Sequence, residues 1–164
     1  MWPPKGIKDA VPDPNFMLVA RIEALIAGHG QAEASERAHA YAAAGADAIL
    51  IHSRQSHADE VLSFAEAWGQ QLPVLVVPTK YYRTPVEAYR RAQISTVIWA
   101  NHNLRAAVAS MRKVCNRILH EESIAGIEHE VASLEEVFGL LRYNELAAAE
   151  RKYLPERRPA AVDK

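Results

Sequence analysis

Four short runs of apolar residues divide the chain, at residues 16–20, 48–51, 74–77 and 96–100. Each run is continuously apolar, a pattern typical of strands that are buried on both faces of a parallel sheet. Helical patterns separate the runs. The alternation therefore predicts four βα units and a parallel sheet with helical crossovers, wound either as a doubly wound sheet or as a barrel.

The crossover helices are predicted from apolar and small side chains at helical spacing over residues 31–44 and 57–68. Gly45 follows the first of them, at a position where a left-handed residue commonly ends a helix. Thr84 and Pro85 are typical of a third helix start, with threonine as the N-cap and proline at the first helical position. We therefore expect a helix to follow each of these three strands.

A fourth helix is predicted over about residues 104–120, and Cys115 falls on its apolar positions, so we expect this cysteine to be buried. Ser133 and Glu136 have the spacing of a capping box, which predicts a further helix start. Residues 144–153 form another amphipathic segment. The chain should therefore continue as helices after the fourth βα unit.

Composition narrows the class of protein. The chain has 164 residues, of which 49% are hydrophobic, enough to build a core. The net charge of −1 lacks the excess of positive charge that is typical of proteins that bind nucleic acid. No apolar run approaches the roughly 20 residues that a membrane span needs. A single cysteine excludes a disulfide framework, and the first residues lack the apolar segment of a signal peptide. We expect a cytoplasmic protein that binds neither nucleic acid nor membranes.

The domain organisation expected from these patterns is simple. Residues 1–12 form a lead-in, residues 13–155 form one α/β domain with its C-terminal helices, and residues 156–164 form a disordered tail, because little apolar matter follows Leu154.

Polar residues follow the apolar runs on the carboxyl-terminal side, which is the edge where α/β folds bind ligands. Arg21 follows the first run and could hold a carboxylate or phosphate through two hydrogen bonds, or form a structural ion pair with Glu23. His52 ends the second run and could act directly as a donor, base or anion ligand, or support a neighbouring group. Arg21 and His52 are the candidate catalytic residues.

Two further segments carry polar chemistry at the same predicted edge. Residues 79–83 (TKYYR) could bind a ligand or only cover the edge and solvate their own charges. Residues 101–103 (NHN) could form an anion site at a helix N-terminus, although capping by Asn103 is the simpler interpretation. Glu23 is the one carboxylate at these four predicted strand ends, so the sequence predicts no metal ligands in this chain.

Four long motifs resemble a known superfamily. Residues 16–28 (FMLVARIEALIAG) and 44–53 (AGADAILIHS) are similar to the isocitrate lyase / phosphoenolpyruvate mutase superfamily. Residues 77–85 (VPTKYYRTP) and 97–106 (VIWANHNLRA) narrow the resemblance to the phosphoenolpyruvate mutase family. The resemblance extends over about residues 13–155, nearly the whole chain.

The resemblance implies a (β/α)8 barrel of the TIM type and an isomerase that interconverts phosphoenolpyruvate and phosphonopyruvate, the entry step of phosphonate biosynthesis. It implies Mg²⁺, bound to the carboxylate and oxo groups of the small-molecule substrate. Arg21 matches an arginine that grips the transferring phosphoryl group, and His52 matches a histidine that reaches the same group. Positioning and charge stabilisation are the tasks that such chemistry leaves to a protein.

The resemblance also implies that the four strands are strands five to eight, so that this chain is the C-terminal half of the barrel. The Mg²⁺-binding carboxylates and a mobile loop would then belong to the N-terminal half, and the isolated chain would be an incomplete enzyme. Family members often form tetramers that exchange their last barrel helix, and four strands leave two open sheet edges, so we expect a homo-oligomer. We also consider a separate N-terminal half as a partner. Two alternatives stay open: a phosphonopyruvate hydrolase, a family that lacks the motifs at 80–85 and 99–103, and a non-catalytic truncated or split-enzyme subunit.

Overall fold

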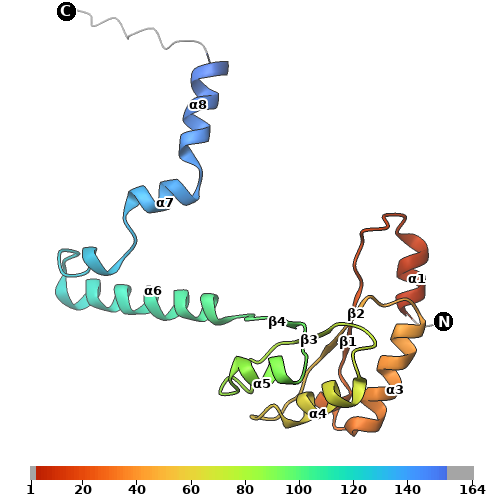
Figure 1. Ribbon diagram of the computed structural model, residues 1–164. Helices are drawn as coiled ribbons and strands as arrows, with labels where there is room; N and C mark the ends of the chain where they lie inside the picture. The colour runs from red at the N-terminus through yellow and green to blue at the C-terminus, as the bar shows by residue number, and fades with distance from the viewer. Residues whose placement is uncertain (1–2, 155–164) are drawn as a thin grey trace, which may run out of the picture. The chain divides into compact units, whose positions relative to one another are not determined.

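The computed structural model describes residues 3–154, and the tail expected at 156–164 lies outside the described residues. A four-stranded parallel sheet with the order β1-β2-β3-β4 confirms the predicted sheet (Figure 1). The consecutive order lacks the reversal that defines a doubly wound sheet. The strands are β1 (Val19–Ile22), β2 (Ala48–Ile51), β3 (Val74–Val76) and β4 (Thr96–Val97).

Two strands are shorter or later than the apolar runs predict. The Asp13 carboxylate and carbonyl accept from the amides of Asn15 and Phe16, so a turn occupies the start of the first run. The fourth run leaves the sheet after the Ile98 amide donates to the Val76 carbonyl at 2.8 Å. The next hydrogen bond between β3 and β4 would need the amide of Pro78 as its donor. Proline has no amide hydrogen, so the pairing ends there.

Most side chains of the strands alternate between a buried face and a more exposed face, which corrects the expectation of burial on both faces. Ala48, on the second face, is the buried exception. The buried face packs against the crossover helices and includes Ala20, Ile22, Ile49, Ile51, Val74 and Val76. On the opposite face Arg21 is exposed, and Leu50 and Leu75 are only partly buried. Within residues 3–154 the sheet therefore has one covered face.

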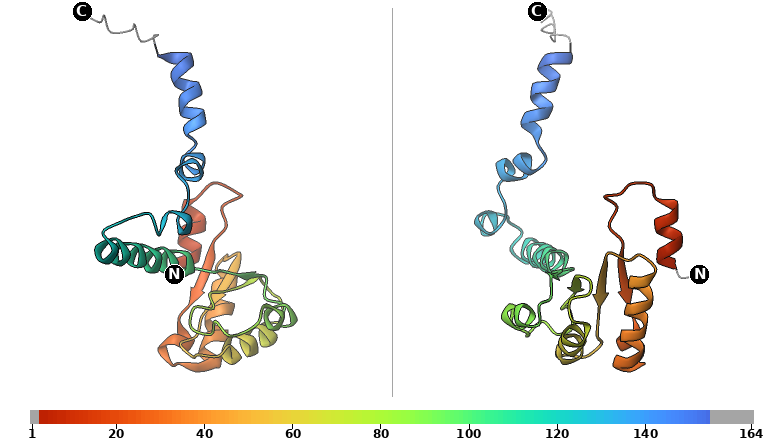
Figure 2. Two further views of the ribbon diagram at one scale, coloured as in Figure 1. Left: turned by 90° about the vertical axis from the view of Figure 1, so that its left-hand side faces the viewer. Right: turned by 45° about the vertical axis from the view of Figure 1, so that its right-hand side comes forward.

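Helices α3 and α4 lie beside the strands (Figure 2), and α3 contacts both β1 and β2. Trp68 at the end of α4 is buried, stacks on Phe64 and donates its indole N–H to the Leu72 carbonyl at 3.0 Å. Gly45, with φ +94°, follows the end of α3 as predicted. The helices of this part are α1 (Pro3–Ala10), α2 (Ala24–Ala27), α3 (Gly30–Ala43), α4 (Asp59–Trp68) and α5 (Val86–Arg91).

The predicted start of α5 is one residue too early. The helix begins at Val86, and Pro85 before it is extended, with φ −69° and ψ 148°. The Thr84 amide donates to the Tyr81 carbonyl at 3.0 Å, so Thr84 closes a turn and its side chain makes no capping bond.

The chain divides into two compact units between Arg105 and Ala106, and each is described by itself. The second unit contains most of α6 together with three short segments. Its elements are α6 (His102–Glu121), the 3₁₀ helix η1 (Glu128–Glu130), α7 (Leu134–Leu140) and α8 (Tyr143–Tyr153). No helix within residues 3–154 is both long and apolar enough to span a membrane.

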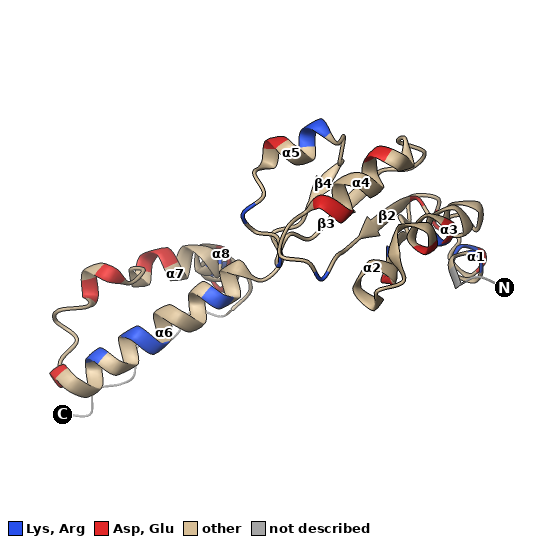
Figure 3. Cartoon of the chain, turned by 90° about the horizontal axis from the view of Figure 1, so that it is seen from below, with Lys and Arg blue, Asp and Glu red and all other residues tan. Residues whose placement is uncertain are grey.

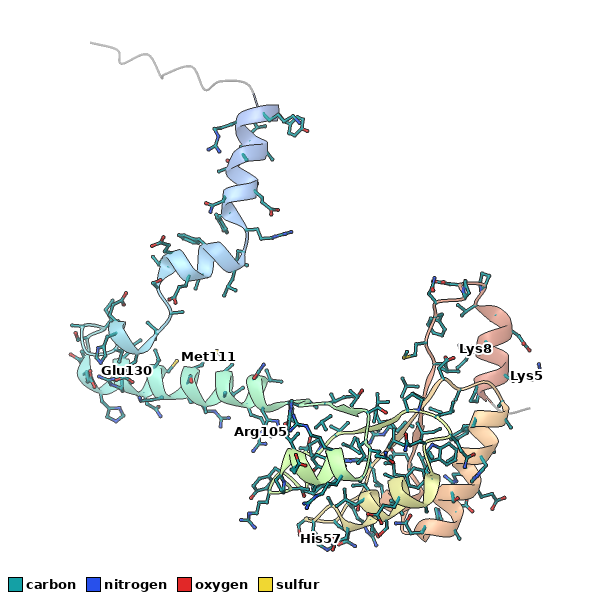
Figure 4. All side chains as sticks on the ribbon, in the orientation of Figure 1. Lys5, Lys8, His57, Arg105, Met111 and Glu130 are labelled. Carbon is teal, nitrogen blue, oxygen red and sulfur yellow. The ribbon has the colours of Figure 1, made fainter. Side chains whose placement is uncertain are left out.

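In the second unit, Glu130 (labelled in Figure 4) is paired with Lys113 and Arg117 of α6. Figure 3 shows basic residues along α6 and the acidic first turn of α7. The predicted capping box is confirmed, because the Ser133 hydroxyl accepts from the Glu136 amide and the Glu136 carboxylate accepts from the Ser133 amide. Cys115 is exposed, which corrects the expectation of burial: α6 has no buried residue among those described.

Asp47 joins α1 to the amino-terminal edge of the sheet. Its carboxylate accepts from the Leu18 amide at 2.6 Å and pairs with Lys8 at 2.6 Å. Lys8 (labelled in Figure 4) also donates to the Phe16 carbonyl at 2.8 Å. The hydrogen bond from the Leu18 amide, followed by that from Lys8, lowers the pKa of Asp47.

We expect Asp47→Asn to lower the free energy of unfolding by about 1 kcal/mol at neutral pH, because a charged acceptor is lost at a partly exposed site. The folded-state pKa lies below the unfolded value, so this stabilisation is present above about pH 4 and disappears as the pH falls through the folded pKa. Urea unfolding at neutral and acidic pH would measure the gap between wild type and variant.

The matched control is Asp9→Asn, which removes an exposed ion pair with Lys5 and should leave stability unchanged. A gap between wild type and Asp47→Asn that stays constant down to pH values below both pKa values would contradict the assignment.

Candidate functional site

The site begins with Arg21, the third residue of β1. Its guanidinium pairs with the carboxylate of Glu23, and both side chains are about half exposed. This is the structural ion pair that the sequence analysis gave as the alternative to anion binding by Arg21. The pairing uses Nε and leaves the terminal guanidinium nitrogens, Nη1 and Nη2, so Arg21 can pair with Glu23 and still present two donors to an anion.

His52 follows β2 directly and lies on the same face of the sheet as Arg21. Arg21 is in register with Leu50, and His52 comes two residues after Leu50, so the period of two puts both side chains on the more exposed face. His52 is partly buried. The parallel pairing therefore brings together the two residues that the sequence singled out.

Tyr81, from the loop after β3, contacts His52 directly. The Tyr81 hydroxyl lies 3.3 Å from His52 Nδ1, and the two ring centroids are 5.9 Å apart. Tyr81 is fully buried, and burial raises its pKa far above the usual value, so the phenol keeps its proton. The sequence marked the segment 79–83 but gave no sign that this tyrosine, 29 residues away, is the partner of His52.

The electrostatics of the site favour a neutral imidazole. Burial, followed by the positive charge of Arg21, lowers the pKa of His52, and Lys80 adds to the effect while Glu23 opposes it. At neutral pH His52 is therefore uncharged and has one N–H donor and one acceptor nitrogen. The cationic character of the site comes from Arg21 and Lys80.

A partly buried hydrogen-bond network holds the loop after His52. Ser53 is fully buried, its hydroxyl donates to the Glu60 carboxylate, and it accepts from the Gln55 amide at 3.0 Å. The Gln31 side chain donates to the Glu60 carbonyl at 2.7 Å. The sequence analysis did not single out Glu60, whose position in the first turn of α4 lets it reach back to the end of β2.

Arg54 is a further cation that the sequence analysis missed. Gly28 ends α2 with φ +83°, and a Cβ at this position would lie 3.4 Å from the Arg54 guanidinium. The glycine thus supplies both the left-handed backbone and room for the arginine. Arg83, in contrast, lies over the ring of exposed Tyr82 at 5.4 Å, as expected of a residue that solvates its own charge.

The segment 101–103 differs from the expected cap. Helix α6 begins at His102, and the Asn101 carbonyl accepts from the Arg105 amide at 3.0 Å, so Asn103 lies inside the helix and does not cap it. Asn101 Oδ1 and His102 Nδ1 are buried without a hydrogen-bond partner among the described residues. An anion site here stays a prediction.

The residues present do not by themselves fit a magnesium site. Within residues 3–154 no group of three or more His, Cys, Asp or Glu side chains is arranged to hold a metal ion. Glu23, the carboxylate beside Arg21, is already paired with that arginine. What this edge offers is a set of hydrogen-bond donors and positive charges, suited to an anion such as a phosphoryl group.

Comparison with known proteins places this edge in context. The chain is 45% identical over 150 residues to the phosphoenolpyruvate phosphomutase of Tetrahymena pyriformis, covering 92% of this chain and 50% of the relative. It is 42% identical over 143 residues to the phosphonopyruvate hydrolase of Variovorax sp., covering 87% of this chain and 49% of the relative. The chain thus spans about half the length of the curated relatives it matches.

Solved structures of a phosphomutase and of a phosphonopyruvate hydrolase are also similar to this chain over about half of their own length. The phosphoenolpyruvate phosphomutase from Streptomyces platensis subsp. rosaceus matches with a TM-score of 0.88 at 40% identity, over 93% of this chain and 53% of that chain. A phosphonopyruvate hydrolase in complex with oxalate and Mg²⁺ matches with a TM-score of 0.87 at 39% identity, over 93% and 54%. The sequence profile of the phosphoenolpyruvate phosphomutase family matches residues 5–119, and this chain belongs to that family.

Proposed function

We propose that this chain contributes the phosphoryl-binding part of an isomerase site that interconverts phosphoenolpyruvate and phosphonopyruvate. The observation that carries the proposal is the convergence of Arg21 and His52 on one face of the sheet, at its carboxyl-terminal edge. Relatives named phosphoenolpyruvate phosphomutase are 45% and 46% identical over most of the chain, which supports this choice of reaction.

The four strands would be strands five to eight of an eight-stranded barrel. Three observations support this arrangement: the consecutive parallel order, the similarity to about half of each relative, and the exposed second face of the sheet. In a closed barrel this second face would line the interior, with Arg21 at the rim.

In the proposed reaction the C–P bond of phosphonopyruvate breaks, and its electrons stay on the pyruvate fragment as an enolate. The enolate oxygen then forms the new O–P bond, so no proton, water or oxidant is consumed. Arg21 would hold phosphoryl oxygens through its terminal nitrogens, and neutral His52 would donate one hydrogen bond to the same group. Such positioning and charge stabilisation are what phosphoryl transfer requires of a protein.

Magnesium enters the proposal as an expectation from the relatives. A phosphonopyruvate hydrolase of the same fold was solved with oxalate and Mg²⁺, and a divalent cation would neutralise substrate charge. Since the described residues form no metal cluster, we propose that the ligands come from a partner segment, in a separate N-terminal half.

A second reaction is favoured by one specific observation, the 42% identity to a phosphonopyruvate hydrolase. In that reaction a water oxygen would form the bond to phosphorus, and the enolate carbon would take up a proton to give pyruvate and phosphate. A third alternative is a non-catalytic subunit. The products separate these three alternatives.

We predict that the 164-residue chain alone does not convert phosphonopyruvate in the presence of Mg²⁺, because its described residues form no cluster of three or more metal-ligating side chains. When the chain is co-expressed with the N-terminal half of the Tetrahymena phosphomutase, the two together should convert phosphonopyruvate to phosphoenolpyruvate. ³¹P NMR would measure this conversion. That half expressed alone is the control. Inorganic phosphate as product would favour the hydrolase, and turnover by the isolated chain at the rate of an intact phosphomutase would contradict the prediction.

Arg21→Ala in the complemented enzyme should lower kcat by about 10²–10³-fold, the effect typical of removing one charge-stabilising donor. Arg21→Lys should recover only part of the loss, because an ammonium keeps the charge but not the planar pair of donors. The matched control is Arg90→Ala in α5, an exposed side chain whose pairing with Glu87 should not affect turnover. Equal rates for Arg21→Ala and Arg90→Ala would overturn the assigned role.

We also propose that the chain associates with copies of itself through the apolar side chains of its second unit. Exposed residues there include Met111, Leu119, Leu134, Leu140 and Leu146. Exposed apolar surface of this extent is typical of interaction sites.

Light scattering of the full chain should therefore give a mass above that of a monomer. Leu134→Asp should weaken the association, because an acidic residue suits the first turn of α7 but not an apolar contact. Glu135→Gln, at the neighbouring exposed position, is the control. A clean monomer for the wild-type chain would contradict the proposal.

A further inference from the structure

The hydrogen bond between Tyr81 and His52 has two possible directions, and they give the histidine opposite chemistry. If Tyr81 donates, His52 Nδ1 is the acceptor and the ring proton sits on Nε2. If Nδ1 carries the proton, Nδ1–H donates to the phenol oxygen and Nε2 is left as an acceptor. An acceptor facing the oxygens of a phosphoryl group would repel them, whereas an N–H would bind them.

The surroundings of Tyr81 decide between these directions. Burial, the largest cause, raises the pKa of Tyr81, so the phenol keeps its hydrogen and needs an acceptor for it. Tyr81 is fully buried, so water does not compete for its hydrogen. Among the described residues, His52 is the one side chain that forms a hydrogen bond with the Tyr81 hydroxyl. If Nδ1–H were the donor, the phenol hydrogen would be buried without an acceptor, which is unfavourable.

The other ring nitrogen is available. No hydrogen bond from His52 Nε2 occurs within the described part of the chain, and the imidazole is only partly buried. Burial, followed by the positive charge of Arg21, lowers the pKa of His52, so the neutral ring has only one proton to place. The position of that proton is then set by the contact at Nδ1, as is general for neutral histidines.

We propose that Tyr81 is a positioning residue that donates its hydroxyl hydrogen to His52 Nδ1 and thereby holds the imidazole as the Nε2–H tautomer, with Nε2–H free to bind a phosphoryl oxygen. The role in phosphoryl binding rests on the proposed function. The tautomer itself does not, because it follows from contacts within this chain.

The test is ¹⁵N NMR of the histidine side chains in the full 164-residue chain at mildly alkaline pH, with the His52 signals assigned by their loss in His52→Gln. Wild type should show a protonated Nε2 and a hydrogen-bonded, unprotonated Nδ1. In Tyr81→Phe the Nδ1 signal should move toward that of a nitrogen without a hydrogen bond, and the fraction of Nδ1–H should rise. Tyr82→Phe, at an exposed neighbouring position, should leave both signals unchanged.

A wild-type spectrum with the proton on Nδ1 would overturn the proposal, and this result needs no variant to fold. An unchanged Nδ1 signal in folded Tyr81→Phe would overturn it as well. In the complemented enzyme, Tyr81→Phe should lower kcat about tenfold with little change in KM, as removal of a single orienting hydrogen bond implies. If the tautomer is as proposed but the complemented enzyme forms no product, the proposed function fails while the tautomer assignment holds.

Discussion

The parallel pairing of β1 with β2 is the constraint on which the candidate site depends. It puts Arg21 opposite Leu50, and the two-residue period of a strand then brings His52 to the same face one step further along. A slip of one residue in β2 would send His52 to the face covered by helices and Ile51 to the site. The buried residues Ile49 and Ile51 oppose such a slip, because they would lose their places in the core.

Much of this arrangement could be predicted from the sequence, because it follows from long-range patterns. Continuous apolar runs separated by helical patterns predict parallel strands, and parallel strands have their polar carboxyl ends at one edge. Arg21 and His52 were found in this way. The contact between Tyr81 and His52 could not be, since it depends on the path of a loop that no periodic pattern describes. The turn that shifts the start of α5 to Val86 was missed for the same reason.

The second face of the sheet and the helices of the second unit both carry apolar side chains that residues 3–154 leave partly or fully exposed. The apolar runs have the composition of strands buried on both sides, yet residues 3–154 cover one side only. Cys115 was expected to be buried because its helix is amphipathic, and among the described residues of α6 none is buried. Amphipathic patterns thus predicted surfaces suited to burial, but they could not predict whether the cover comes from this chain. The proposed barrel and the proposed association would each supply it.

The ion pair between Lys8 and Asp47 lies at the amino-terminal edge of the sheet, whereas Arg21 and His52 lie toward the carboxyl-terminal edge. The ion pair that holds α1 and the candidate anion site thus lie at opposite ends of the same short strands. Substitutions at one end can change how firmly the fold is held without altering the geometry at the other. The edge around Asp47 is therefore where stability can be changed without touching the side chains of the candidate site, whereas substitutions around His52 also meet the buried side chains of Tyr81 and Ser53.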